Sequence, residues 1–235
     1  MSFTADEMMT VAAARALHGR TSCFVGIGLP STAANLAKRT GSPDLVLVYE
    51  SGTIGAKPRT LPLSIGDGEL AVTADAVVSV PEVFNYWLQP GRIEVGFLSA
   101  AQLDRYGRIN TTVIGPYDRP ATRLPGAGGA PEIAANCPEI IMIVRQNRRT
   151  FVETLDFVTS VPRGPVLLIT DLGVLRTRQD SGELTLTALH PGVELAAVRA
   201  ATGWDLAVAD PLGRTDPPTQ TELAALRALT TGVHR

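Results

Sequence analysis

The stretch Leu45-Val-Leu-Val-Tyr49 is an uninterrupted apolar run, and Glu50-Ser-Gly52 follows it directly. A continuous apolar run of this length is typical of a strand that is buried on both faces, as in a parallel sheet. Runs of similar character recur at residues 23–27, 95–99, 140–144 and 166–169. The chain therefore predicts several buried strands that need helices to cover them.

Helical patterns separate these runs. Capping boxes predict two helix starts, one at Thr4 with Glu7 and one at Thr219 with Glu222. Further helices are expected at residues 31–39, 81–89 and 194–201. Strands that alternate with helices indicate an α/β fold with a mainly parallel sheet. The length of 235 residues suits one domain, residues 1–235, in which 205–218 is a polar connector to the last helix.

Composition excludes several classes of protein. Hydrophobic residues make up 45% of the chain, charged residues 19%, and the net charge is -2. This balance predicts a globular core and provides no field to attract nucleic acid or an anionic membrane. The sequence shows neither a signal-peptide pattern nor a long apolar span, so we expect a cytoplasmic protein. Cys23 and Cys137 lack the spacing of a zinc site, and we expect no metal.

Glu50 is the first candidate for chemistry. Ligands of parallel α/β sheets bind at the carboxyl ends of strands, where this carboxylate is expected to lie. Gly52 and Gly55 would let the backbone approach a substrate closely. Position alone leaves two alternatives, namely that Glu50 caps a helix or forms a structural ion pair.

The second candidate is the glycine cluster Gly126-Ala-Gly-Gly129, in a stretch of about 28 residues, 106–133, without regular pattern. Such a long loop is usually functional. Backbone N–H groups exposed by glycines can bind a phosphate or stabilise an oxyanion. The spacing matches neither a P-loop nor a dinucleotide-binding fingerprint, and a plain tight turn is the alternative.

The function of two further segments stays open at this level. Residues 102–110 suit a turn around Gly107 and look like a solvated hairpin. Arg145, Arg148 and Arg149 suit a solvated face, with a phosphate-facing role as the alternative.

In combination these segments become specific. The order is Gly26-Ile-Gly-Leu-Pro30, Glu50-Ser-Gly52, Ala101-Gln-Leu-Asp104 with Gly107 and Asn110, Gly126-Ala-Gly-Gly-Ala130, and His190-Pro-Gly-Val193 with Ala201-Thr-Gly203. From about residue 5 to residue 229, the chain resembles the β subunit of family I coenzyme A transferases, of the glutaconate CoA-transferase type. The resemblance implies an open, mainly parallel sheet covered by helices, of the CoA-transferase/NagB-like kind.

The resemblance also implies roles for particular residues. The family's catalytic glutamate falls on Glu50, and its oxyanion- and CoA-binding glycines fall on Gly126, Gly128 and Gly129. Ser51, Gly52, Gln102 and Asn110 are further candidates for the substrate pocket. The implied partner is a separate α subunit, in an αβ or α2β2 assembly. The implied substrates are a CoA thioester and a carboxylic acid, with no permanently bound cofactor.

Three functions remain in competition at this level. The first is CoA transfer through a glutamyl-CoA thioester on Glu50. The second is hydrolysis, decarboxylation or ring opening of a CoA thioester on the same scaffold, with Glu50 as general base. The third is a non-catalytic subunit whose partner holds the chemistry. The retained glutamate favours transfer.

Overall fold

The computed structural model describes residues 2–231. Contacts group the chain into two compact units. The first unit contains the chain up to Phe97, the short segment Asn136–Pro138 and the chain from Pro217 onward. The second unit contains Leu98–Ala135 and Glu139–Asp216.

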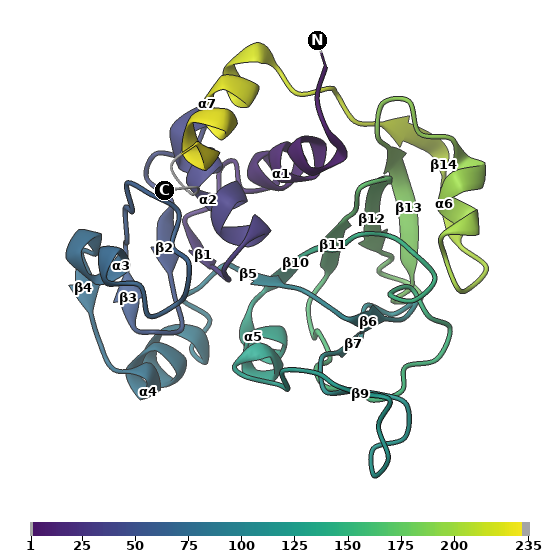
Figure 1. Cartoon of the computed structure of the whole chain (residues 1–235), viewed down its shortest axis with the longest axis horizontal. Coiled ribbons are helices and arrows are strands. Elements are labelled where there is room, and N and C mark those ends of the chain that lie inside the picture. Colours follow the sequence, from purple (N-terminus) through teal and green to yellow (C-terminus); the bar gives the residue numbers. More distant parts are fainter. Residues whose placement is uncertain (1, 232–235) are drawn as a thin grey trace. The chain divides into compact units, whose positions relative to one another are not determined.

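The first unit has five strands in the order β5-β1-β2-β3-β4 (Figure 1). The strands are β1 (Ser22–Phe24), β2 (Val46–Val48), β3 (Thr53–Ile54), β4 (Ala76–Val77) and β5 (Val95–Leu98). β1 pairs in parallel with both β2 and β5, whereas β3 pairs antiparallel with β2 and β4. The predicted apolar runs at 23–27, 45–49 and 95–99 thus form the parallel centre of this unit.

Helices surround these strands. They are α1 (Ala5–Ala16), α2 (Leu29–Thr40), α3 (Gly68–Thr73), α4 (Val80–Glu82) and α7 (Gln220–Thr230), with a π-helical segment η1 (Val83–Leu88). α1, α2 and α7 pack against one another. The helix expected at residues 81–89 is divided between α4 and η1, and Phe84 of η1 contacts Phe24 of β1 with 5.7 Å between ring centroids.

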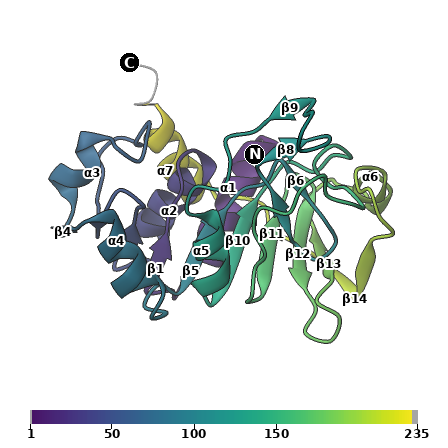
Figure 2. The ribbon, with the colours of Figure 1, turned by 90° about the horizontal axis from the view of Figure 1, so that it is seen from below.

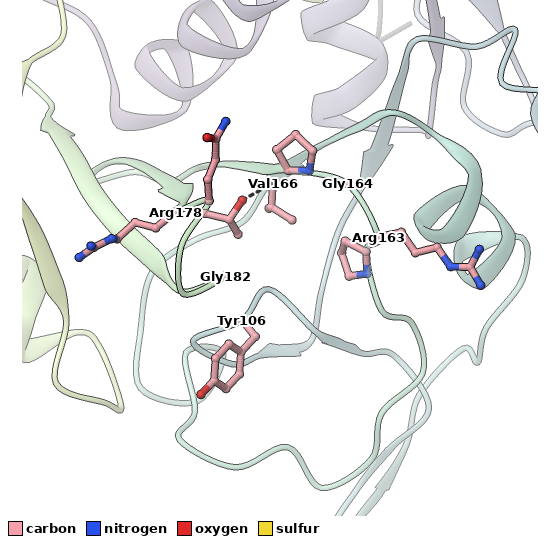
Figure 3. A pocket seen from close by; sticks show the side chains of 10 residues that line it. Tyr106, Arg163, Gly164, Val166, Arg178 and Gly182 are labelled. Carbon is pink, nitrogen blue, oxygen red and sulfur yellow. Dashed lines mark hydrogen bonds between the residues drawn. The ribbon is translucent and has the colours of Figure 1, made fainter.

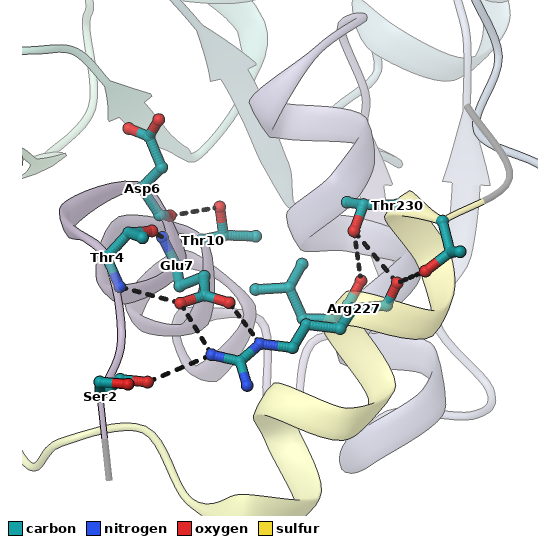
Figure 4. A network of polar contacts seen from close by, with 9 residues as sticks. Ser2, Thr4, Asp6, Glu7, Thr10, Arg227 and Thr230 are labelled. Atoms are coloured by element: carbon teal, nitrogen blue, oxygen red, sulfur yellow. Dashed lines mark hydrogen bonds and ion pairs between the residues drawn. The ribbon is translucent and has the colours of Figure 1, made fainter. Parts of the chain in front are cut away.

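Both predicted capping boxes are present, and an ion pair joins their helices. Thr4 caps α1 and Thr219 caps α7, each with its glutamate bonded back to the cap. Figure 4 shows Arg227 of α7 against Glu7 of α1, where Arg227 Nε donates to Glu7 Oε1 over 2.7 Å. The cap glutamate of α1 therefore also holds the last helix of the chain.

The second unit has a five-stranded sheet in the order β14-β13-β12-β11-β10. Its strands are β10 (Glu139–Ile143), β11 (Val166–Ile169), β12 (Gly173–Thr177), β13 (Leu184–Leu189) and β14 (Ala207–Arg214). β10 and β11 are parallel, and β12 and β13 continue antiparallel. Residues 140–143 are buried, as their lack of polar alternation predicted.

Short elements complete the second unit. They are β6 (Gln102–Leu103), β7 (Ile109–Asn110), β8 (Val113–Ile114), β9 (Thr122–Arg123), α5 (Ala130–Asn136) and α6 (Leu195–Ala200). Figure 1 and Figure 2 both show α6 at the end of this unit where β14 lies. The expected long loop 106–133 thus contains β7, which pairs with the preceding β6, the small hairpin β8–β9 and the start of α5.

The segment expected to be a connector, 205–218, contains strand β14, which the sequence pattern missed. β14 pairs in parallel with β13 through an irregular register. Its Pro211 and Gly213 look like loop residues, but proline is tolerated at a sheet edge, where its missing N–H needs no partner. The α/β class, with helices around an open sheet whose central strands are parallel, is confirmed, and antiparallel strands extend it in both units.

Candidate active site

Glu50 lies in the turn that leads from β2 into β3. Tyr49 N–H donates to Thr53 O and Gly52 N–H donates to Tyr49 O, both over 3.0 Å. The turn therefore closes immediately around Glu50, at the carboxyl end of a strand that has parallel pairing. This is the position that the sequence predicted for it.

Two glycines make this turn possible. Gly52 has φ 102°, and a Cβ added there would lie 1.9 Å from Val78 O. Val78 N–H also donates to Gly52 O over 2.9 Å, so the turn is held against the start of the next segment. Gly55 has φ 69°, and its added Cβ would lie 2.2 Å from Asp75 Oδ2. The glycines thus allow β4 to approach the Glu50 turn. This close approach is a structural reason for both glycines, in addition to the predicted approach of a substrate.

Tyr49 anchors the strand end that precedes Glu50. Its side chain is fully buried, and its hydroxyl lies 3.3 Å from Ser31 Oγ of α2. Asn35 Nδ2 donates to Ser31 O over 2.9 Å. Burial raises the pKa of Tyr49, so its phenol stays protonated at neutral pH. The hydroxyl of the neighbouring Ser51 is buried and has no hydrogen-bond partner among the described residues.

The glycine turn in the second unit precedes α5. Gly126 and Gly128 have φ of 102° and 51°, and an added Cβ would meet nothing within 4 Å at either position. These two glycines are therefore needed for the backbone conformation, and space lies open beside them. Within residues 2–231, no acceptor is bonded to the Gly128 N–H. Gly129 O accepts from Ile133 N–H at the start of α5.

Gly126 is fixed from both sides by Thr111. Thr111 Oγ1 donates to Gly126 O, and Gly126 N–H donates to Thr111 O, both over 2.8 Å. Thr111 N–H in turn donates to Thr159 Oγ1 over 2.9 Å. The first residue of the glycine turn is thus held by a polar network that no sequence pattern indicated.

Gln102 and Asn110 belong to the same network. Both are buried, and Asn110 Nδ2 donates to Gln102 Oε1 and to Val113 O, both over 2.7 Å. Gln102 Nε2 donates to Asp156 Oδ2 over 2.9 Å. These bonds give the two amides a structural role in carrying the Thr111 loop. Their contact with a substrate stays a prediction.

Other reactive side chains are poorly suited to catalysis. Cys23 and Cys137 are free and buried. Burial raises the pKa of both thiols, to about 12 for Cys137, which disfavours a reactive thiolate. His190 is buried with Nε2 2.8 Å from Thr170 O, and burial lowers its pKa. No group of three potential metal ligands occurs among the described residues.

One cavity of the second unit is lined by residues outside the glycine turn. Figure 3 shows this hollow of about 350 Å³ at the amino end of β11, lined by Tyr106, Arg163, Gly164 and Val166 among others. Ligands in parallel sheets bind at the carboxyl ends of strands, so we do not assign the reaction to this cavity. Within residues 2–231, no helix is both long and apolar enough to cross a membrane.

Comparison with known proteins identifies the class. The family described as coenzyme A transferase matches residues 6–201. The chain therefore belongs to the coenzyme A transferase family, and it is a β subunit of family I, the type that its motifs predicted. The predicted enzyme class, a CoA-transferase, is confirmed as well.

Individual relatives refine this picture. The chain is 56% identical to one subunit of 3-oxoadipate CoA-transferase of Pseudomonas knackmussii, over 97% of this chain and 94% of that protein. Glutaconate CoA-transferase of Acidaminococcus fermentans has a similar structure, with a TM-score of 0.90 at 28% identity over 96% of this chain and 94% of that one. The decarboxylase AibA/AibB also reaches 0.90, at 29% identity over 99% and 97% of the two chains.

Proposed function

We propose that this chain works with a separate α subunit to move coenzyme A from an acyl-CoA to a carboxylic acid, with Glu50 as the nucleophile. The observation that carries the proposal is the position of Glu50, on a glycine-dependent turn at the carboxyl end of a parallel strand. The family membership supplies the reaction class. Relatives that are themselves named as single subunits of CoA-transferases support the separate partner, and the stoichiometry is proposed as αβ or α2β2.

The reaction follows from what a carboxylate can do. The Glu50 carboxylate attacks the thioester carbonyl, the C–S bond breaks, and CoA thiolate leaves behind an acyl-glutamyl anhydride. The thiolate then attacks the glutamyl carbonyl, which releases the donor acid as a carboxylate and forms a Glu50–CoA thioester. An acceptor carboxylate reverses the two steps. Each step exchanges one acyl bond for another, and no net proton or electron is needed.

The backbone of the glycine turn can support these steps. Each attack creates a tetrahedral oxyanion, and a preorganised N–H donor stabilises it by about 2.7–4 kcal/mol. We propose Gly126, Gly128 and Gly129 for this site. The Gly128 N–H, without an acceptor in the described chain, is the best candidate for the donor. Ser51 and Gly52 are proposed to border the acyl group.

We propose a dicarboxylic acid as the acceptor. The relatives at 56% and 34% identity are named for 3-oxoadipate and for glutaconate, and both are dicarboxylates. The second carboxylate of this acceptor would be recognised outside the reacting centre, where binding energy can be used to drive the exchange.

We also propose one functional domain over residues 1–235. The family model covers parts of both compact units, which supports this proposal.

The test is to trap the intermediate in the assembled α–β complex. Incubation with the acyl-CoA substrate followed by borohydride should reduce the Glu50 thioester, and peptide mass spectrometry should locate the change at residue 50. Glu50→Gln should abolish both transfer and trapping while the complex still assembles. Glu82→Gln is the matched control, because it removes a first-unit carboxylate that the mechanism does not use, and Glu82 forms no ion pair within the described residues. Wild-type turnover by Glu50→Gln would reject the mechanism.

The second candidate is a hydrolase or lyase on the same scaffold. The similarity to the decarboxylase AibA/AibB is the observation that favours it. There Glu50 would act as a general base, and CoA or carbon dioxide would be released without any acceptor acid. Measuring turnover with and without a dicarboxylate acceptor separates the two reactions, because only transfer requires the acceptor.

A further inference from the structure

A basic turn follows β10 in the second unit. It consists of Asn147, Arg148, Arg149 and Thr150, which border a shallow hollow of about 650 Å³. Both arginines are exposed, and neither forms an ion pair with a carboxylate of the described chain. Two adjacent guanidinium groups without carboxylate partners leave a local positive charge that an anion can neutralise.

This turn is held rigid by Asn147. Its Oδ1 accepts from the N–H groups of Arg149 and Thr150, over 3.0 and 3.2 Å. Its backbone carbonyl accepts from the N–H groups of Thr150 and Phe151, over 3.0 and 2.8 Å. Beyond the turn, Phe151 is buried and stacks on Trp204, with 5.7 Å between ring centroids. The backbone that carries the arginines is thus preorganised.

One guanidinium is already positioned. Arg148 Nε donates to Ala200 O, at the end of α6, over 2.9 Å. This bond uses one donor and leaves the two Nη groups, which present a planar fork suited to phosphate oxygens. Two acidic groups that interact with or follow the neighbouring residues are engaged elsewhere: Asp171 accepts from Gln146 N–H, and Glu153 pairs with Arg105.

The turn lies at the same edge of the strands as the glycine turn. β10 ends at Ile143 and the basic turn follows, so it leaves the carboxyl end of a strand that is parallel to β11. α5 joins the amino end of β10 through a two-residue connection, and Ala134 O accepts from Arg163 N–H beside the start of β11. The helix therefore runs back along the strands, and its first residues point toward the carboxyl edge.

Backbone hydrogen bonds connect the two turns. Leu103 N–H of β6 donates to Thr150 O over 2.7 Å, and β6 pairs with β7, whose Asn110 precedes Thr111. Thr111 is bonded to Gly126. Three hydrogen-bonded steps thus separate the two turns, and each step spans about the distance between neighbouring strands of a sheet. The turns therefore lie on the order of 15 Å apart. In an acyl-CoA, the long pantetheine arm likewise separates the thioester from the phosphates.

We propose that the turn formed by residues 147–150 binds a phosphate group of coenzyme A through Arg148 and Arg149, while the thioester lies at the glycine turn. This inference rests on the proposed function, because it assumes that the thioester reacts beside Gly128. Anchoring the phosphates away from the reacting carbonyl supplies the remote binding energy that transfer between acids requires.

The test compares thioesters of one acyl group in the assembled complex. The substrates are the acyl-CoA, the acyl-dephospho-CoA, which lacks the 3′-phosphate, and the acyl-pantetheine, which lacks all phosphates. The double variant R148E/R149E should raise the KM for acyl-CoA about tenfold or more, the value of one charge-assisted hydrogen bond. Its kinetics with acyl-pantetheine should match those of the unmodified protein. A rise in KM with acyl-CoA but not with acyl-dephospho-CoA would identify the 3′-phosphate as the group that the turn binds.

Controls separate this result from simpler explanations. Arg163→Glu reverses an exposed charge at the amino end of β11 and should leave all three KM values unchanged. The single variant R149E keeps the Arg148 bond to Ala200 and guards against misfolding of the double variant. An unchanged KM for acyl-CoA, or an equal rise in the KM for acyl-pantetheine, would overturn the proposal. Borohydride trapping at Glu50 with acyl-pantetheine would meanwhile show that the proposed function stands independently.

Discussion

The substitution Gly52→Ala tests how the Glu50 turn is built. The added Cβ would start 1.9 Å from Val78 O, so the two must separate by at least about 1 Å to reach an allowed contact. The backbone at φ 102° would in addition be strained by roughly 1–3 kcal/mol. Both effects act two residues after the proposed nucleophile.

The expected magnitude is large for activity and small for stability. A displacement of about 1 Å at a reacting group typically costs on the order of 100-fold in rate. We therefore expect kcat of the assembled complex to fall by about two orders of magnitude. The strain alone should lower the melting temperature by roughly 2–10 °C in a protein of this size.

The assay is steady-state transfer with the acyl-CoA substrate, together with thermal unfolding followed by circular dichroism. Gly68→Ala is the matched control, because a Cβ there meets nothing within 4 Å and Gly68 lies at the start of α3, where φ is not positive. It should leave both readouts unchanged or slightly improved. A Gly52→Ala complex with wild-type kcat would refute the claim that this close approach positions Glu50.

Two further predictions concern stability and reactivity. Burial alone would raise the pKa of Glu222, but the Arg15 guanidinium, bonded at 2.7 Å, and Thr219 outweigh it and lower the pKa to about 2. The contribution of Glu222 to the free energy of unfolding should therefore be complete above about pH 4.5 and be lost as the pH falls toward 2. Urea unfolding of the wild type and of Glu222→Gln at several pH values would measure this contribution. Because burial raises the pKa of the Cys23 and Cys137 thiols, neither should react with iodoacetamide in the native protein at pH 8, whereas both should react in urea; rapid native labelling would contradict this reasoning.

The sequence predicted the elements best where the local signal was strong. The apolar run before Glu50 became a buried parallel strand, and both capping boxes appear at helix starts. Strand β14 was missed because Asp210, Pro211 and Gly213 carry loop signals, and only pairing with β13 makes the segment extended. Pairing partners that are far apart in sequence leave no local pattern.

The candidate site followed the same division. Glu50 and the glycines 126 and 128 were predicted from their residue types and their order along the chain, and their roles in the reaction stay predictions. The hydrogen bonds between Thr111 and Gly126 were not predicted, because threonine and asparagine in a loop look like ordinary turn residues until their partners are known. For the same reason the bond between the Gln102 amide and Asp156 was not predicted, and the role of Gln102 in the substrate pocket stays a prediction.

By itself, the amino-acid sequence determined the α/β class, the family and the position of the carboxylate after a buried strand, because periodicity, capping and motif order are local properties of the chain. Only the tertiary structure decided why Gly52 must be glycine, what holds the glycine turn and where the basic turn lies. Each of these depends on atoms from segments distant in sequence, such as Val78, Thr111 and Ala200, which folding brings within a few ångströms.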